Sequence, residues 1–234
     1  MRLRNWWTGA AVVVLVAVSA ATPQEKTTEH YYFFQLVFLS RPANAPQMSP
    51  DALEKLQEEH MGNIHLMHRQ GKLMLAGPML DDTPLKGIFV FKTQSAVEAE
   101  KWARTDPAIK ANRLAPEIHT WIQPENSFSN PPESNPMENY ALVLYRPGPN
   151  AKPHNGWDPI MKDHAAWLQD LRDSGKMVIG GPFRDGGPGY THLLIFTGSA
   201  EDAAATVARD PFVVAGEAVP EVHPWMTQMG VLRQ

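Results

Sequence analysis

One stretch of this sequence occurs twice, and that repeat constrains the fold more than any other feature. His60 and Gly77 in the first copy correspond to His164 and Gly181 in the second, and each pair is separated by 104 residues. A repeat at a fixed spacing indicates repeated structural units. About a hundred residues is a usual size for one domain. We therefore expect the 234-residue chain to hold two copies of one domain.

The two copies share short motifs in the same order. Each has a histidine, a Gly-Lys segment that ends in Gly-Pro, an Asp-Pro step and a closing segment with Glu, His and Trp at alternate positions. In the first copy these are His60, Gly71–Pro78, Asp106-Pro107 and Pro116–Trp121. In the second copy they are His164, Gly175–Pro182, Asp210-Pro211 and Pro220–Trp225. The order of the motifs shows that the repeat spans whole domains.

Hydrophobic patterning predicts the same six elements in each copy. Apolar runs predict strands, and Ser or Asp before Pro or an acidic residue predicts helix starts. In the first copy the expected strands are 31–39, 73–76, 88–91 and 118–122, and the helices start at Ser49 and Ser95. In the second copy the strands are 141–145, 178–179, 193–196 and 222–226, and the helices start at Asp158 and Ser199. The β-α-β-β-α-β order is typical of ferredoxin-like α+β domains.

The first helix of each copy is predicted to bury its histidine. Apolar residues recur at steps of three and four, which places them on one helix face. In the first copy this stripe is Leu53, Leu56, His60, Ile64 and Met67. In the second copy it is Ile160, His164, Leu168 and Leu171. His65 and His68 lie at i and i+3 beside the first stripe, and we interpret them as a solvated face rather than a metal site.

The N-terminus has the features of a signal peptide. Arg2 and Arg4 precede an apolar run of 12 residues at 10–21 that contains Ser19-Ala20-Ala21, a small-residue pattern typical of a cleavage site. We predict a signal peptide over residues 1–21 and a periplasmic or secreted product without stable membrane insertion. An uncleaved anchor that starts at Trp6 is the alternative.

Composition separates the rest of the chain into two repeats and a linker. Prolines among Asn, Ser and Glu mark residues 123–138 as a semi-extended linker. Repeat 1 is then predicted at 30–122 and repeat 2 at 139–234. Each four-stranded sheet needs a partner to cover its free face. We therefore predict that repeat 1 pairs with repeat 2 as an intramolecular, pseudo-dimeric α+β barrel.

Charge and cysteine content exclude several classes of function. The net charge of −4 gives no basic surface for nucleic acid. The chain has no cysteine, which excludes disulfides, thiol nucleophiles and thiolate metal sites. No motif predicts a metal or a cofactor. A small molecule remains the expected partner.

The motif set resembles the YCII-related (YciI-like) family over both repeats. The helix histidine, the Gly-Lys-hydrophobic-Gly-Pro strand, the Asp-Pro step and the closing strand carry the resemblance, together with the Ser-Ala-Glu/Asp-Ala start of the second helix. The resemblance implies ferredoxin-like units paired as an α+β barrel. It also implies a catalytic His/Asp pair, which maps onto His60 with Asp106 and His164 with Asp210. One activity known in the family is dehydrochlorination of a chlorinated hydroxyhydroquinone, whereas the tandem arrangement and the signal peptide depart from its usual single-domain, cytoplasmic pattern.

The residues themselves allow two interpretations of each member of the pair. A histidine can act as a general acid or base near neutral pH, and a carboxylate partner fixes its tautomer. The alternative is a core histidine that binds a backbone carbonyl. Asp before Pro is also an ordinary helix N-cap, so capping alone can explain Asp106 and Asp210. The histidine recurs in both copies while Asn63 in one copy corresponds to Trp167 in the other, which keeps the functional interpretation of the histidine open beside the structural one. For the two aspartates, capping is the favoured interpretation, and a capping aspartate can still bind a histidine.

The closing strand of each repeat offers a second candidate site. Alternation along a strand places Glu117, His119 and Trp121 on one face in the first copy. In the second copy it places Glu221, His223 and Trp225 on one face. We expect the aliphatic side to pack on helices and the polar-aromatic side to line the barrel interior or an interface. There it can bind a planar ligand, on the other side of the sheet from the helix histidines.

Two functions from different classes follow. The first is an enzyme of lyase or isomerase type that moves protons on a small cyclic or enolisable molecule, with His60 and His164 as acid/base and Asp106 and Asp210 as orienting carboxylates. The second is a non-catalytic small-molecule-binding module that uses the Glu/His/Trp strand face. A structural domain with a dry barrel interior is the third possibility.

Overall fold

Each half of the chain forms an antiparallel four-stranded sheet with helices on one face. The computed structural model describes residues 30–154, 158–184 and 189–233. The first half contains β1 (Tyr31–Ser40), α1 (Pro50–Arg69), β2 (Leu73–Pro78), β3 (Leu85–Phe91), α2 (Ala96–Ala103), α3 (Pro107–Lys110) and β4 (Ala115–Pro124). The second half contains β5 (Met137–Pro147), α4 (Pro159–Asp173), β6 (Met177–Pro182), β7 (His192–Phe196), α5 (Ala200–Val207), α6 (Pro211–Val214) and β8 (Ala218–Gln228).

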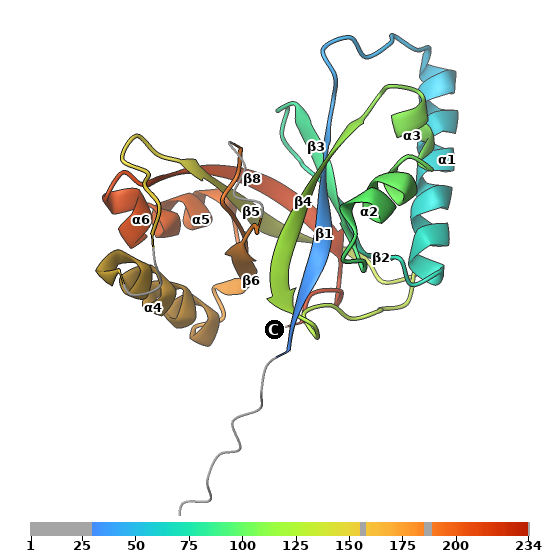
Figure 1. The fold of residues 1–234 in the computed structure, drawn as a ribbon. Helices are drawn as coiled ribbons and strands as arrows, with labels where there is room; N and C mark the ends of the chain where they lie inside the picture. Colours follow the sequence, from blue (N-terminus) through green and yellow to red (C-terminus); the bar gives the residue numbers. More distant parts are fainter. Residues whose placement is uncertain (1–29, 155–157, 185–188, 234) are drawn as a thin grey trace, which may run out of the picture.

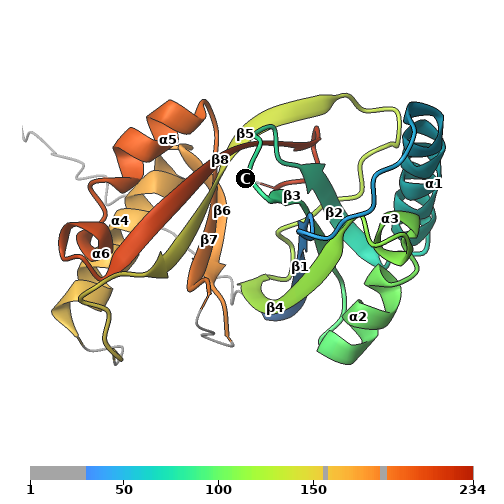
Figure 2. The same ribbon diagram turned by 90° about the horizontal axis from the view of Figure 1, so that it is seen from above.

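The strand order confirms the predicted ferredoxin-like repeats. It is β2-β3-β1-β4 in the first sheet and β6-β7-β5-β8 in the second. Helices α1 to α3 lie outside the first sheet and α4 to α6 outside the second, and the two sheets face each other between these helix layers (Figures 1 and 2). The two tandem repeats therefore fold as one α+β unit with the sheets inside.

The two sheets join at both edges, so the strands close into a barrel. At one seam, Leu80 N, just beyond the end of β2, donates to Pro224 O of β8 at 2.8 Å. At the other seam, Arg184 N, just beyond the end of β6, donates to Thr120 O of β4 at 2.8 Å. Short antiparallel bridges, Met79 to Trp225 and Trp121 to Phe183, complete the seams. Repeat 1 thus pairs with repeat 2 within one chain, as expected.

The barrel interior is a packed hydrophobic core shared by both repeats. Phe34 and Phe38 of the first sheet belong to the same buried cluster as Leu142 and Leu193 of the second. Two further clusters lie between each sheet and its own helices. Burial of this apolar surface stabilises the fold by roughly 25 cal/mol per Å². Because the largest cluster takes residues from both repeats, neither repeat has a complete core of its own.

One glycine at each seam explains why Gly-Pro recurs in both copies. A Cβ on Gly77 would lie 2.1 Å from Met226 O and 2.6 Å from Trp225 Nε1. A Cβ on Gly181 would lie 2.7 Å from the Gln123 side chain. Only glycine allows the edge strand of one sheet to approach the last strand of the other this closely.

The first helix differs from its prediction in how much of it is buried. Ser49 caps α1 as expected, accepting from Ala52 N at 3.3 Å, and Pro50 begins it. Along the predicted stripe only Met67 is fully buried, and Leu53 is 36% exposed. The helix stands off the sheet over part of its length, because a cavity lies beneath it.

Other boundaries differ by a few residues. β4 continues to Pro124, β5 begins at Met137, and α2 ends at Ala103 rather than near Thr105. Asp158 stands at the start of α4 but makes no capping hydrogen bond with its side chain. That carboxylate accepts from His154 Nδ1 at 2.9 Å instead.

The linker is docked on the barrel rather than extended freely. Ser129 N donates to Val231 O at 2.8 Å, and Arg233 N donates to Ser127 O at 3.0 Å. The linker therefore pairs with the C-terminal segment, and this pairing holds residues of both beside α1. The predicted signal peptide, residues 1–21, lies outside the described residues.

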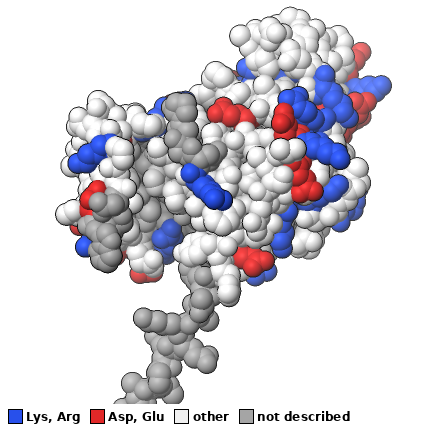
Figure 3. All heavy atoms as spheres, viewed as in Figure 1, with Lys and Arg blue, Asp and Glu red and all other residues white. Residues whose placement is uncertain are grey.

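The distribution of charged side chains on the surface agrees with the net charge of −4. On the face drawn in Figure 3, acidic and basic side chains are interspersed, without an extended basic patch. Among the helices of residues 30–154, 158–184 and 189–233, none is long and apolar enough to cross a membrane.

Candidate functional site

The structure brings together the histidine and the aspartate of repeat 1. His60 Nδ1 lies 2.7 Å from Asp106 Oδ2. The Asp106 side chain is fully buried, and the His60 side chain keeps 14% of its surface exposed. A hydrogen bond to a buried carboxylate holds the imidazole in the Nδ1–H tautomer. The Nε2 lone pair then points away from the aspartate.

Asp106 has both of the roles that the sequence allowed. Its Oδ1 accepts from Ala108 N at 2.9 Å and so caps α3. Its Oδ2 accepts from His60 and also from Asn63 Nδ2 at 3.4 Å. Thr105 Oγ1 donates to Asn63 Oδ1 at 3.2 Å. Asn63 and the cap together keep the carboxylate oriented toward His60.

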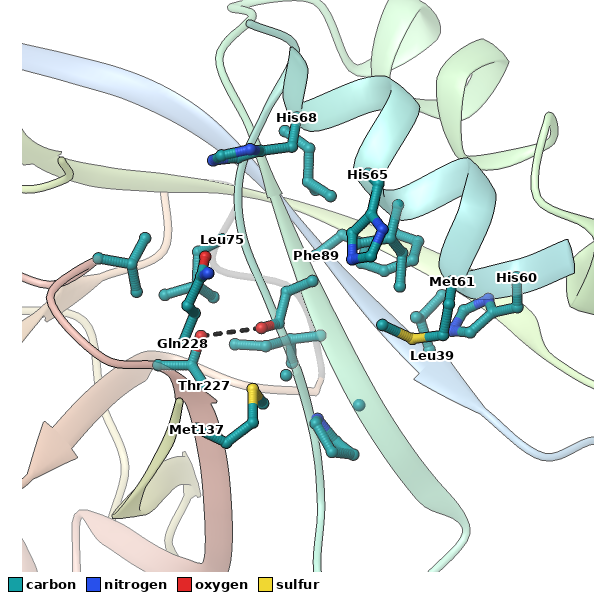
Figure 4. Close-up of a pocket in the computed structure, with 18 of the residues that line it drawn as sticks. Leu39, His60, Met61, His65, His68, Leu75, Phe89, Met137, Thr227 and Gln228 are labelled. Carbon is teal, nitrogen blue, oxygen red and sulfur yellow. Dashed lines mark hydrogen bonds between the residues drawn. The ribbon is translucent and has the colours of Figure 1, made fainter. Parts of the chain in front are cut away.

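The His60 side chain lines a cavity of about 430 Å³ between α1 and the edge of the first sheet. Small-molecule sites commonly have volumes of 300–1,000 Å³. The α1 wall is one stripe whose successive members are three residues or one residue apart: Gln57, His60, Met61, Ile64, His65 and His68. The opposite walls come from β2, β3, the linker and the C-terminal segment. Figure 4 shows the α1 side chains projecting toward the strand edge, where Thr227 and Gln228 lie opposite.

His65 and His68 are part of this cavity, which corrects the prediction of a solvated face. Both side chains are partly buried, and both contribute to the cavity wall. The sequence pattern missed this because the covering residues come from far away in the chain. Glu133 and Asn135 of the linker and Val231 of the C-terminal segment complete the cavity.

The corresponding pair of repeat 2 has the same geometry in a closed environment. His164 Nδ1 lies 2.9 Å from Asp210 Oδ1, and only 3% of the His164 side chain is exposed. Its Nε2 is buried and makes no hydrogen bond with the described residues. Asp210 Oδ1 also accepts from Phe212 N at 2.8 Å, and Tyr145 Oη donates to Oδ2 at 2.7 Å. This pair has no open side for a ligand.

Three substitutions between the repeats explain why one site is open and the other closed. Leu39 and Tyr145 occupy equivalent positions, opposite Pro116 and Pro220. Gly87 and His192 are equivalent, opposite Pro78 and Pro182. Ala108 and Phe212 each follow the capping aspartate by two residues. In every pair the larger, aromatic side chain is in repeat 2.

These aromatic side chains cover His164 directly. The Phe212 ring stacks on the His164 ring with centroids 4.1 Å apart and planes 12° apart. The His192 ring meets His164 edge-on at 5.3 Å. Burial, and next the proximity of His164, lower the pKa of His192 to about 3, so His192 stays neutral near pH 7. Burial also raises the pKa of Tyr145, with Asp210 adding to the effect.

The strand residues of the second candidate site lie on the other side of the sheet, as expected. Trp121 and Trp225 are fully buried in the shared barrel core. Trp121 Nε1 donates to Gly181 O at 3.2 Å. The aliphatic face of β4 packs on the helix side, where Ile118 joins the helix-facing cluster. Both tryptophans therefore help to close the barrel.

The other strand residues surround a polar opening at one end of the barrel. His119 and His223 are buried, with His119 Nε2 3.0 Å from Glu117 Oε1 and His223 Nδ1 2.7 Å from Asp81 Oδ2. Glu221 is paired with Arg146, Nε to Oε1, at 2.5 Å. Hydrogen bonds from Arg146 and Tyr190 lower the pKa of Glu221 despite its partial burial. A cavity of about 550 Å³ borders this network. Within the network, the charge of Arg146 is paired with that of Glu221.

No group of three or more His, Asp or Glu side chains within residues 30–154, 158–184 and 189–233 is arranged to hold a metal ion. The two sets of histidines lie on opposite sides of the sheet: His119 faces the barrel interior beside Phe38. His60 lies on the helix side beside Phe89.

Comparison with known proteins defines first the fold and then the family. Solved structures with this fold include a heme-binding protein from Thermus thermophilus, with 13% identity, a TM-score of 0.51, and coverage of 86% of this chain and 92% of that chain. They also include a mutant chlorite dismutase from Candidatus Nitrospira defluvii, with 8% identity, a TM-score of 0.55, and coverage of 85% and 92%.

A scan against protein families matches the YCII-related domain over residues 35–121 and again over 140–226. The chain therefore belongs to the YCII-related domain family, in two tandem copies. A search among curated proteins finds no match to this chain.

Proposed function

We propose that repeat 1 is an acid-base catalytic domain of lyase or isomerase type for a small cyclic or enolisable molecule. The observation that carries this proposal is the 2.7 Å contact between His60 Nδ1 and Asp106 Oδ2 at the wall of an apolar cavity of about 430 Å³. Repeat 2 supplies the rest of the barrel and one wall of that cavity. Its own pair is covered by Phe212 and His192.

The chemistry follows from the orientation of the imidazole. Nε2 of His60 takes a proton from carbon next to a carbonyl group, and the electron pair moves to the carbonyl oxygen as an enolate. Asp106 stabilises the imidazolium that forms. Return of the proton to another atom completes an isomerisation, whereas expulsion of a leaving group from the neighbouring carbon completes an elimination. A positioned general base contributes about 10²–10⁴-fold to such a rate.

Exchange of carbon-bound protons with solvent tests the proposal across the whole class of enolisable compounds. A panel of small lactones and cyclic ketones is incubated in D₂O with the protein, and deuterium uptake is followed by NMR. We expect catalysed exchange of at least one compound, and a loss of about 10²-fold or more in His60→Gln.

His164→Gln is the matched control, because it removes the same group from the closed pair. It is expected to keep the exchange activity. Equal loss in both variants, or unchanged exchange in His60→Gln with an intact fold by circular dichroism, would contradict a catalytic role for His60.

A non-catalytic binding module is the second candidate. The apolar cavity with His65 and His68 in its wall favours it, since these two imidazoles make no hydrogen bond with other described side chains. One protein of the same fold is described as heme-binding, and heme iron needs an axial ligand such as histidine. The donor chemistry of His65 and His68 fits that need. Saturable hemin binding that His65→Ala or His68→Ala weakens, without proton exchange on any compound, would favour this candidate.

We also propose that the mature protein acts outside the cytoplasm, on the basis of the signal-like residues 1–21. The intact mass of the protein recovered from the producing cells tests this. A mature chain that begins at residue 21 or 22 is expected, and a full-length cytoplasmic product would contradict it.

A further inference from the structure

The cavity of repeat 1 has an excess of unpaired basic groups at its wall. His65 and His68 from α1 and Lys86 from β3 all line it. Within the described part of the chain, none of these three side chains makes a hydrogen bond or an ion pair. Their hydrogen-bond donors are therefore available to a ligand.

The single carboxylate in the wall is already neutralised. Glu133 Oε1 accepts from Arg69 Nη1 at 3.0 Å, and the same guanidinium nitrogen lies 3.4 Å from Oε2. The remaining lining is largely apolar, from side chains such as Met74 and Ile88. The cavity therefore presents the Lys86 ammonium and the imidazole hydrogen-bond donors of His65 and His68 to a ligand over an apolar floor.

The basic groups are set apart from the proposed reacting group. His65 and His68 follow His60 by five and eight residues on one helix, which corresponds to about 8 and 12 Å along the axis. His65 and His68 themselves are three residues apart and lie on one helix face. Figure 4 shows both projecting from α1 over the strand edge, with His60 farther along the helix. One end of the cavity thus suits proton transfer and the other suits an anionic group.

From this arrangement we infer that the natural ligand carries an anionic group, a carboxylate or an ionised phenol, about one ring length or more from the carbon that faces His60. His65 and His68 bind this group, and the apolar walls hold the body of the molecule. Repeat 2 has Gln169 and Arg172 at the equivalent positions. Arg172 Nη2 there donates to Gly180 O at 2.9 Å, so that side chain is committed to the backbone. The inference rests on the proposed function of this cavity and adds the class of ligand.

Two fluorescent dyes with one ring system test the charge preference. 8-Anilinonaphthalene-1-sulfonate carries a sulfonate, and N-phenyl-1-naphthylamine lacks it. Equilibrium titrations at pH 7 and low salt are compared for the wild type and the double variant His65→Gln/His68→Gln. We expect the double variant to weaken binding of the sulfonated dye at least fivefold and that of the neutral dye less than twofold.

Lys55→Gln is the matched control. Lys55 lies on the same helix, its side chain is 76% exposed, and it does not line the cavity. This variant removes one positive charge from the same helix and should change binding of both dyes less than twofold. Weakening of the sulfonated dye as large as that in the double variant would overturn the inference, because general electrostatics would then explain the preference.

Cavity-filling variants separate failure of this inference from failure of the proposed function. Ala76→Phe from β2 and, independently, Ile64→Phe from α1 should abolish binding of both dyes. If they do so while the double variant affects both dyes equally, the cavity binds ligands but the anionic preference is overturned. If the folded cavity-filling variants leave both dyes bound, the cavity is not the binding site, and the inference and the proposed function both fail.

Discussion

The imidazoles of His60 and His164 make the same hydrogen bond to an aspartate and differ in what covers them. Around His60 the equivalent positions hold Leu39, Gly87 and Ala108. Around His164 they hold Tyr145, His192 and Phe212, and the Phe212 ring stacks on the imidazole at 4.1 Å. Three side chains thus decide whether a histidine-aspartate pair is a site or a buried polar contact.

Chemical modification measures this difference directly. Diethyl pyrocarbonate reacts with an accessible, unprotonated imidazole nitrogen. We expect His60 to react at least tenfold faster than His164, which is 3% exposed, with each site followed by peptide mass spectrometry. Exposed His30 serves as the internal reference. Similar rates for His60 and His164 would show that Phe212 does not protect the second pair.

Two other histidines give opposite contributions to the pH dependence of stability. The pKa of His192 is about 3 in the folded protein, below its ordinary value of about 6.5. Between these values the unfolded chain binds a proton that the folded protein does not. The free energy of unfolding therefore falls as the pH is lowered through this window, by at most about 1.4 kcal/mol per pH unit. His192→Leu should show a shallower loss between pH 6.5 and 4 in urea titrations.

His154 changes the free energy of unfolding with pH in the opposite direction. Hydrogen bonds to Asp158 and Glu217 raise its pKa, and its imidazole contacts both carboxylates. The resulting stabilisation is fully present below about pH 6.5 and is lost as the pH rises through the folded pKa. His154→Gln should therefore destabilise the protein at pH 6 and much less at pH 9. A destabilisation that is equal at both pH values would exclude this ionic contribution.

At the level of the elements, the edge strands determine whether the barrel closes. β2 meets β8 at Gly77, and β6 meets β4 at Gly181. In each case a strand edge lies against the partner sheet with no room for a side chain. An edge that is paired in this way is also protected from pairing with other chains.

A pair of glycine substitutions tests the seam. Gly77→Ala places a methyl group against Met226 O and Trp225, and overpacking of this kind costs about 1–3 kcal/mol. Gly62→Ala is the control, because Gly62 lies within α1 and a Cβ there meets no atom within 4 Å. That change should stabilise the protein by about 0.5–1 kcal/mol. Urea denaturation measures both, and a Gly77→Ala protein as stable as the wild type would contradict the tight seam.

For the whole molecule, the shared core implies that the two repeats fold together. The largest buried cluster takes residues from both sheets, and hydrogen bonds cross both seams. The linker adds to this coupling, since it pairs with the C-terminal segment and covers the cavity of repeat 1. A ligand bound in repeat 1 would therefore also contact residues that follow β8.

Denaturation monitored in both halves tests this coupling. Because the chain has no cysteine, a fluorophore can be attached to a single cysteine introduced at exposed Val97 of α2 or at exposed Val214 of α6. The two labelled proteins should give coincident unfolding transitions, despite the tandem repeats. Trp225→Ala should lower the stability seen by both reporters by about 3–5 kcal/mol, because Trp225 is fully buried in the shared core. Two separate transitions, with only the second half affected, would mean that the repeats fold independently.

Much of the fold was predictable because its signals are local. The capping serines, the Asp-Pro steps and the alternation in the closing strands each depend on neighbouring residues. Leu53 shows the limit of this reasoning: its position in the apolar stripe predicted burial, yet it is 36% exposed. A helical pattern shows which residues share a face, and it cannot show whether the sheet beneath is in contact with that face.

The sequence alone determined the two repeats and their ferredoxin-like order, because repeated spacing, apolar patterning and capping residues record local geometry. The pairing of each helix histidine with its aspartate was implied only by the resemblance to the YCII-related family, and the residues themselves left capping as an alternative. The tertiary structure decided which pair has access to a ligand. Gly87 and His192 lie far from their histidines in the chain, and the linker that covers the cavity is farther still. Burial is a property of neighbours in space, so only the folded barrel separates an open site in repeat 1 from a closed one in repeat 2.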